Sequence, residues 1–327
     1  MMKLNLKHLA MATALSTVVC APALSAEGYP NRPIRMIVPF APGGASDFVG
    51  RIIQPALAEQ LKQTVVVDNR PGASGNIGVE TAARATPDGY NILLGNVGTM
   101  AINPVYYTKF QYKPLVDLIP ITQVVDVPGS LVSHPSVPAK TVKELVAHMK
   151  SNPGKLNYGA AAPSSANTLE ALMFLNMSGT TATMIPYKGG AGPATIGLLG
   201  NEVQWLMATF SSTVNFAKQG RLRMLGIIAP ERSSAMPEAP TMREQGFDMV
   251  VGSWQGIFVP KGTPANVVNT LSKVAHASMK NAEVIKKLGD SGVAVITSKD
   301  PADFRAFVKN ETDRFAKAIR DNNIKTE

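Results

Sequence analysis

The sequence predicts an α/β fold arranged as two lobes, and three observations lead to this prediction. Short runs of β-branched and apolar residues alternate along the chain with segments that carry apolar residues at helical spacing. The chain has 327 residues, and the roughly 300 that follow its first segment are more than one core usually organises. Two strand-like segments, far apart in the sequence, are placed so that both could pass from one lobe to the other.

The first 26 residues have the pattern of a secretion signal. Lys3 and Lys7 form a basic start, residues 9–20 are almost entirely apolar or small, and small residues lead up to Ala26. A buried N-terminal helix is the alternative, but the apolar run is short and follows a basic start. The run is also too short to anchor the chain across a bilayer. We therefore predict residues 1–26 as a signal peptide that is cleaved near Ala26.

The single cysteine, Cys20, lies inside this segment. Val18 and Val19 precede it, where a lipid-attachment site usually has a small residue. We therefore interpret Cys20 as part of the signal and not as an anchor. Its removal would leave a mature chain without disulfide or thiol chemistry.

The charge of the chain is positive but dispersed. The formal net charge of +9 falls to +7 when Lys3 and Lys7 are removed, and the sequence has no run of five basic residues. A nucleic-acid partner is not expected, because such proteins usually show a basic stripe with interleaved aromatic residues. Dispersed positive charge instead gives a mild attraction for anions in general.

The strands and helices of the first lobe follow each other in alternation. We predict short buried strands at residues 34–38, 65–67 and 92–94. Between the first two, residues 48–61 carry apolar residues on one helical face, and a second helix is expected at 76–85. An order of strand, helix, strand, helix, strand requires crossover connections and predicts a largely parallel sheet.

The same alternation continues in the middle of the chain, and the last third is helical. Predicted strands lie at residues 156–158, 183–186, 203–207 and 222–229. Predicted helices lie at residues 141–150, 165–177, 192–199 and 212–219. Two further helices are expected near residues 267–279 and 304–319, where apolar residues fall on one helical face.

Two segments are candidates for connections between lobes. Residues 119–134 are strand-like but interrupted by proline and glycine, and residues 252–260 are a second strand-like run. If both segments cross, the C-terminal helices return to the first lobe. We predict lobe 1 as residues 27–125 plus 253–327 and lobe 2 as residues 126–252, joined by a two-strand hinge.

A glycine-containing loop after the first strand is the first candidate for a binding site. Gly43 and Gly44 let a ligand approach the backbone closely, and the helix that follows would present its free N–H groups to an anion. Ligands of open α/β sheets bind at this carboxyl end of the strands. The alternative is a tight turn in which Ser46 or Asp47 caps the helix.

Three loops rich in hydroxyl and amide side chains also follow predicted strands. Such neutral donors suit a carboxylate that is held by hydrogen bonds and not by ion pairs. Helix capping is the alternative for each loop taken singly, but their shared position at strand ends in both lobes favours one common cleft. The candidate residues are Asn96, Thr99, Ser164, Ser165, Asn167 and Thr209.

Signals of catalysis are weak. The spacing of Gly72, Gly75 and Gly78 does not fit a dinucleotide-binding fingerprint. The three histidines after residue 26 are far apart and not at metal-ligand spacing. We therefore expect neither an enzyme nor a metal or cofactor.

An ordered series of motifs resembles the Bug family, the substrate-binding proteins of tripartite tricarboxylate transporters. The series covers nearly the whole chain after residue 28. Its parts are Val-Pro-Phe-Ala-Pro-Gly-Gly at 38–44, Asn-Arg-Pro-Gly-Ala-Ser-Gly at 69–75, Pro-Asp-Gly-Tyr at 87–90, Pro-Tyr-Lys-Gly-Gly at 186–190, Ala-Pro-Thr at 239–241 and Trp-Gln-Gly at 254–256.

The resemblance implies a type II periplasmic-binding-protein fold, with two lobes that pinch a ligand carboxylate. In the family, this contact comes from the loops that match residues 40–47 and 159–167. For the first loop the resemblance assigns ligand contact to Phe40, Ala41, Gly43, Gly44 and Asp47.

This chain departs from the family pattern at two places. Asn167 and Thr168 stand where the family often has histidine and leucine, and Trp205 lies where acidic residues are common. The missing acids favour a plain organic acid over an amino acid. We expect Trp205 in the core and keep Phe210 as a candidate at the pocket.

The function that the resemblance implies is solute capture. We expect a monomeric periplasmic protein that binds a small organic carboxylate, with dicarboxylates and aromatic acids as candidates, and delivers it to the membrane permease subunits of a tripartite tricarboxylate transporter. A sensory partner that presents its ligand to a membrane receptor would have the same pocket. An exported hydrolase is a third hypothesis.

Overall fold

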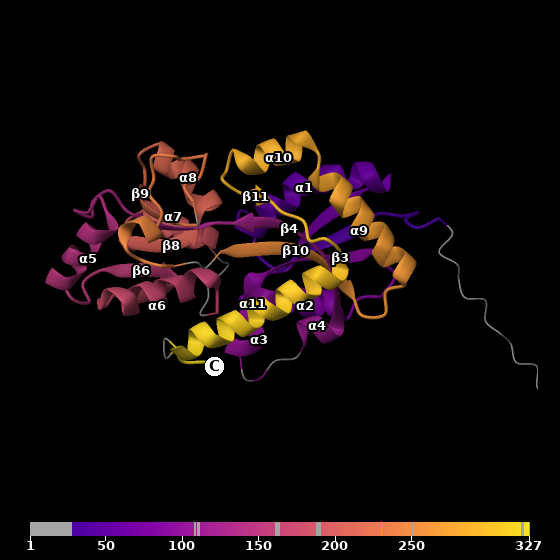
Figure 1. The fold of residues 1–327 in the computed structure, drawn as a ribbon, viewed down its shortest axis with the longest axis horizontal. Helices are drawn as coiled ribbons and strands as arrows, with labels where there is room; N and C mark the ends of the chain where they lie inside the picture. The colour runs from indigo at the N-terminus through magenta and orange to yellow at the C-terminus, as the bar shows by residue number, and fades with distance from the viewer. Residues whose placement is uncertain are drawn as a thin grey trace, which may run out of the picture.

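The computed structural model describes residues 28–107, 109, 112–160, 164–187, 191–229, 231–249, 252–321 and 324–326. The predicted signal peptide and Cys20 lie outside these residues, as do Lys188, Gly189 and Gly190 of one family motif. Figure 1 shows two α/β halves side by side, each built around one sheet, which agrees with the predicted fold class.

The first half is built on a six-stranded sheet. Its strand order is β11-β4-β10-β3-β1-β2. The strands are β1 (Ile34–Val38), β2 (Val65–Asn69), β3 (Asn91–Asn96), β4 (Leu118–Val127), β10 (Ser253–Pro260) and β11 (Ala294–Val295).

The predicted parallel pairing of β1, β2 and β3 is confirmed, but the strands that complete the sheet pair antiparallel. β1 is parallel to β2 and β3, as the crossover helices require. β10 is antiparallel to both β3 and β4, and β11 is antiparallel to β4. The reason is that β10 brings the chain back from the second half and therefore enters the sheet from the opposite end.

The second half is built on a five-stranded sheet with the order β7-β6-β8-β5-β9. β6 is parallel to β7 and β8, whereas β5 is antiparallel to β8 and β9. The strands are β5 (Gly129–Ser133), β6 (Asn157–Ala160), β7 (Thr183–Pro186), β8 (Trp205–Thr209) and β9 (Arg223–Ile228).

Helices cover both sheets. Those of the first half are α1 (Ala45–Leu61), α2 (Asn76–Ala83), α3 (Asn103–Tyr106), α4 (Pro114–Asp117), α9 (Ala265–Met279), α10 (Ala282–Gly289) and α11 (Pro301–Asp321). Those of the second half are α5 (Val142–Ser151), α6 (Ala166–Ser178), α7 (Ala191–Leu199) and α8 (Phe210–Lys218). Three short turns complete the set, η1 (Ala73–Gly75), the π-helical η2 (Gly98–Ile102) and η3 (Arg243–Gln245).

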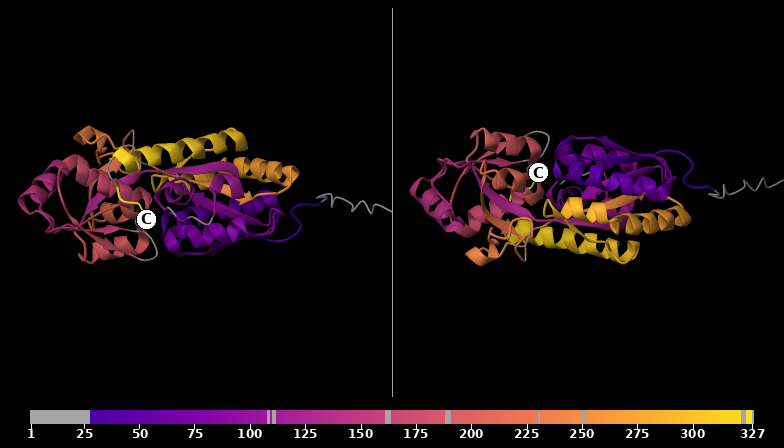
Figure 2. Two further views of the ribbon diagram at one scale, coloured as in Figure 1. Left: turned by 90° about the horizontal axis from the view of Figure 1, so that it is seen from below. Right: turned by 90° about the horizontal axis from the view of Figure 1, so that it is seen from above.

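Two strands connect the halves. β4 ends at Val127 in the first sheet, Pro128 follows, and β5 begins at Gly129 in the second sheet. β10 begins just after the second half and runs through the first sheet between β4 and β3. Figure 2 shows the result from two further sides, with the C-terminal helices packed against the N-terminal half. The lobe limits at 125/126 and 252/253 stay a prediction.

An aromatic cluster fixes α11 on the first sheet. The ring of Phe304 lies 5.7 Å from that of Trp254 and 5.1 Å from that of Phe258, measured between centroids. Gly256 makes room for it, because a Cβ there would lie 2.2 Å from the Phe304 ring. In the second half Trp205 is fully buried and stacks on Tyr158 at 4.8 Å, which confirms its predicted place in the core.

None of the described helices is long and apolar enough to span a membrane.

Replacing Phe304 by alanine should lower the free energy of unfolding by about 3–5 kcal/mol, because a fully buried ring is lost and a cavity remains. Urea denaturation followed by circular dichroism measures this. Ile196→Ala is the matched control, since this side chain is 70% exposed and its loss should stay within about 0.5 kcal/mol. Equal effects of both variants would contradict the proposed packing.

Candidate functional site

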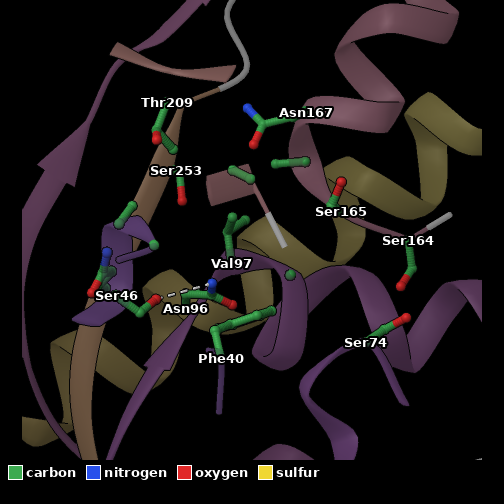
Figure 3. Close-up of a pocket in the computed structure, with 16 residues that line it drawn as sticks. Phe40, Ser46, Ser74, Asn96, Val97, Ser164, Ser165, Asn167, Thr209 and Ser253 are labelled. Atoms are coloured by element: carbon green, nitrogen blue, oxygen red, sulfur yellow. Dashed lines mark hydrogen bonds between the residues drawn. The ribbon is translucent and has the colours of Figure 1, made fainter. Parts of the chain in front are cut away.

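A small cavity lies where strand ends of the two halves face each other (Figure 3). Its volume is about 70 Å³. Side chains and backbone of both halves line it. They are Phe40, Gly44, Ala45, Ser46, Ser74, Asn96, Val97, Gly98, Ser164, Ser165, Ala166, Asn167, Ala191, Thr209, Ser253 and Gln255.

Four helices begin at this cavity. Gly44, Ser165 and Thr209 are the N-cap residues of α1, α6 and α8, and Ala191 is the first residue of α7. The first N–H groups of a helix have no partner within the helix and carry a partial positive charge. No side chain caps α1 or α8 among the described residues. Ser165 Oγ already accepts from the Thr168 N–H of α6, and the Phe210 N–H of α8 donates to the Pro128 carbonyl. The other first-turn N–H groups of both halves are the backbone donors that the cavity can offer to an anion.

The side chains around the cavity are neutral. None of the described residues that line it is ionisable. An anion bound here would be stabilised by helix termini and hydrogen bonds, with no ion pair to a lysine or arginine.

A network below the first loop holds the start of α1 in place. The Asp47 carboxylate accepts from the Gly43 N–H and from Asn69 Nδ2, at 2.9 and 3.0 Å, and pairs with Arg51 Nε at 2.9 Å. Asn69 Nδ2 also donates to the Phe40 carbonyl at 3.0 Å. Burial alone would raise the pKa of Asp47, but its bonds to Arg51, Gly43 and Asn69 together hold it below the ordinary value.

Asn96 is held rigidly at the end of β3. Its Oδ1 accepts from the Thr99 N–H at 3.0 Å and from the Thr99 hydroxyl at 3.1 Å. Its Nδ2 lies 3.5 Å from Ser46 Oγ in the cavity wall (Figure 3). Thr99 is itself fully buried and acts from behind the wall.

Contacts cross the cleft between the halves. Ser164, which precedes α6, donates through Oγ to Asn103 Oδ1 on α3 at 2.6 Å. It also lies 3.3 Å from the Tyr107 hydroxyl, which bonds to Ser74 Oγ at 2.7 Å. The structure thus holds the two walls together around the cavity.

Seven of the twelve residues predicted for the site line the cavity. They are Phe40, Gly44, Asn96, Ser164, Ser165, Asn167 and Thr209.

The other five predicted residues lie elsewhere. Asp47 and Thr99 brace the walls from behind, and Ala41 and Gly43 belong to the loop but do not line the cavity. Phe210 is fully buried in the core, where a Cβ added at Gly292 would come within 2.3 Å of its ring. The packing of Phe210 in the core does not fit ligand contact, whereas ligand contact by the other four residues stays a prediction.

Ser253 and Gln255 also line the cavity, although neither was among the predicted site residues. They stand two residues apart on β10 and so face the same side of the sheet. Both are buried, and Gln255 Oε1 has no hydrogen-bond partner in the described part of the chain. Two polar residues at this spacing in a buried strand are the signal that could have identified them, because buried polar groups need partners.

The described histidines take no part in the cavity. His276 bonds through both ring nitrogens to the carbonyls of Ser272 and Ser298, each at 2.7 Å, and His134 contacts Ser136 at the surface. No histidine among the described residues stands next to a serine of the cavity wall. In the described part of the wall, the serines therefore lack a histidine that could serve as the base of nucleophilic catalysis.

Comparisons with known proteins agree on one family. The family described as Tripartite tricarboxylate transporter family receptor matches residues 49–324 of this chain. The protein BugT of Bordetella pertussis is 34% identical over 313 residues, which cover 95% of each chain.

Solved structures are similar over nearly the whole chain. One is R. palustris Rpa4515 with adipate, at 29% identity and a TM-score of 0.87 over 90% of this chain and 99% of that one. Another is MatC from Rhodopseudomonas palustris with bound malate, at 28% identity and a TM-score of 0.83 over 89% of this chain and 100% of that one.

Replacing Asp47 by alanine should lower the free energy of unfolding at pH 7 by about 2 kcal/mol, because the Gly43 N–H and Asn69 lose a charged acceptor. The stabilisation is present above the unfolded-state pKa of about 3.9 and is lost as the pH falls through the lower folded-state pKa. The difference in the free energy of unfolding between variant and wild type should therefore decrease from pH 5 to pH 2 in urea titrations. Glu59→Ala, at an exposed position of the same helix, is the control. A gap that does not change with pH would refute this role.

Proposed function

This chain belongs to the tripartite tricarboxylate transporter family of receptors, and from that premise we propose that it captures a small dicarboxylate between its two halves. It then delivers the ligand to the membrane permease subunits of such a transporter. The observation that carries the proposal is the meeting of four helix N-termini at an uncharged cavity.

A ligand with two carboxylates fits the distribution of these helix N-termini. α1 belongs to the first half, whereas α6, α7 and α8 belong to the second, so donors approach the cavity from two sides. Adipate and malate, which the two similar structures contain, are both dicarboxylates. An amino acid is disfavoured, because no acidic side chain among the described lining residues could pair with its ammonium group.

The proposed mechanism is closure of two lobes, residues 27–125 plus 253–327 and residues 126–252. The connections through β4–β5 and into β10 act as the hinge. The ligand favours the closed state because only that state brings both sets of helix N-termini to the carboxylates. The bond from Ser164 to Asn103 across the cleft supports this state.

We assign no catalytic step to the site. We propose a monomeric receptor that binds and releases its ligand unchanged, and none of the described residues that line the cavity with the serines is ionisable. This argues against the hydrolase hypothesis.

Malate and adipate should raise the melting temperature of the purified protein, by an amount that grows with ligand concentration. At 100 times the dissociation constant the added stability is about 2.7 kcal/mol. Citrate and benzoate serve as comparison ligands in differential scanning fluorimetry and titration calorimetry. The proposal fails if none of these acids binds.

Gly44→Leu should abolish this binding without unfolding the protein. The backbone of Gly44 has φ −81°, and the heavy atom nearest to an added Cβ is the Ala41 carbonyl oxygen at 3.6 Å, so only the cavity is filled. Gly289→Leu is the matched control, since its Cβ would meet nothing within 4 Å. Full binding by Gly44→Leu would place the ligand elsewhere.

Loss of uptake in a deletion strain, with unchanged transcription, distinguishes transport from sensing.

Expression in a Gram-negative host should yield a periplasmic protein that starts at Glu27. It should contain no thiol, because Cys20 is the single cysteine of the chain. Intact-mass measurement of the periplasmic fraction and a thiol assay in denaturant check both points. A protein that keeps residues 1–26, or a lipid on Cys20, would contradict the proposed export signal.

A further inference from the structure

A buried acid lies directly behind the cavity wall. Glu170 is 1% exposed and stands one turn after Asn167 on α6. Its Oε2 accepts a hydrogen bond from Asn167 Nδ2 at 3.1 Å. Because Asn167 lines the cavity, Glu170 is bonded directly to the cavity wall.

The surroundings of Glu170 keep it out of water at the junction of the two halves. Gly129, the first residue of β5, leaves room for the acid, since a Cβ there would lie 2.9 Å from Glu170 Oε1. Leu169, the neighbour of Glu170, belongs to the same buried cluster as Trp254 on β10. An acid in this place pays a large desolvation cost whenever it is ionised.

Other charged groups near Glu170 come from two neighbouring elements. On α11, Arg314 lowers the pKa of Glu170 but is itself paired with Glu311 at 2.7 Å. On β4, Asp126 lies near the same two residues of α11, and burial raises its pKa as well. For Glu170 the effect of burial is larger than those of the Asn167 hydrogen bond and of Arg314, which both lower the pKa, and burial raises the pKa to about 8. The acid is therefore mostly neutral at pH 7.

The amide of Asn167 can face the cavity in two ways. In this structure Nδ2 bonds to Glu170, and Figure 3 shows Oδ1 turned towards the middle of the cavity. An oxygen in that position repels a carboxylate. Rotating the amide by half a turn offers Nδ2 to the ligand, but Oδ1 then faces Glu170 and needs a donor. A protonated carboxyl supplies that donor, and an ionised one does not.

We propose that Glu170 is a positioning residue, which donates through its protonated carboxyl to Asn167 Oδ1 and so turns Nδ2 towards a bound carboxylate. The inference rests on the proposed function, since it specifies how the same site recognises its ligand. Carboxylate binding then requires a proton on Glu170.

Binding should weaken as Glu170 ionises. With a pKa of about 8, the protonated fraction falls about tenfold from pH 7 to pH 9, and the apparent dissociation constant rises by the inverse of that fraction. At pH 9 each binding event should take up close to one proton. Malate and adipate are fully ionised over this range, so the ligand contributes no titration.

The test is titration calorimetry with malate and adipate at pH 7, 8 and 9, in phosphate and Tris buffers that differ in ionisation enthalpy. The wild-type protein should bind these acids about tenfold more weakly at pH 9 than at pH 7 and should take up a proton on binding at pH 9. Glu170→Gln keeps a donor towards Asn167 at every pH, so its dissociation constant should stay near the wild-type value at pH 7 and change less than twofold by pH 9.

Three further variants separate positioning from a structural effect. Glu170→Met has no donor, so it should bind at least tenfold more weakly at pH 7, with no pH dependence and an unchanged circular-dichroism spectrum. Asn167→Ala should also lose the pH dependence. Asp126→Asn should retain it, because this second buried acid does not contact Asn167.

The outcomes keep the two proposals apart. If neither acid binds wild type at any pH, the proposed function fails. If an acid binds with equal affinity at pH 7 and pH 9, or if Glu170→Gln keeps the tenfold change, the role of Glu170 is refuted while the proposed function stands.

Discussion

The positive ends of four helices meet around a cavity whose described wall carries no ionisable side chain, and this field of backbone N–H groups governs the architecture. A helix terminus can stabilise an anion only if the helix begins at the site. α6 and α8 therefore follow β6 and β8 at the carboxyl ends of these strands, and α1 follows β1 in the other half. Two sheets are needed because one sheet edge would present these termini from a single side.

The same requirement explains the small residues of the wall. A bulky side chain at an N-cap would cover the N–H groups that it precedes, so glycine, serine and threonine occupy these positions in α1, α6 and α8. Their support comes from behind, where Asp47 and Asn69 fix one loop and Thr99 fixes Asn96. The charge near the site, that of Asp47, fixes the backbone of the loop and does not face the cavity.

The local sequence pattern was enough to predict most helices and strands and the loops that follow the strands. The pairing of distant strands could not be predicted in this way. The strand at 34–38 and the helices that follow the strands were predicted because their apolar residues recur at the right period. The antiparallel pairing of β10 was missed, because nothing in its sequence tells which sheet the returning chain joins. Ser253 and Gln255 were missed for the same reason, since they reach the cavity only through that pairing. Phe210 was kept as a candidate because it stands where the chain departs from the family pattern, but its ring lies in a buried cluster with Val214 and Ile227.

Glu170 extends the governing constraint beyond the wall. An ionised carboxylate behind the start of α6 would oppose the field that this helix offers to an anion, and burial already disfavours that form. A neutral acid avoids both costs and still has a donor and an acceptor, whereas Asp47, which must stay ionised, is supplied with Arg51 and two N–H donors. The two acids thus differ in environment for one reason. A carboxylate that is paired with donors, as Asp47 is, can stay ionised beside a site where helix dipoles hold an anion, whereas an ionised carboxylate without such partners would weaken that site.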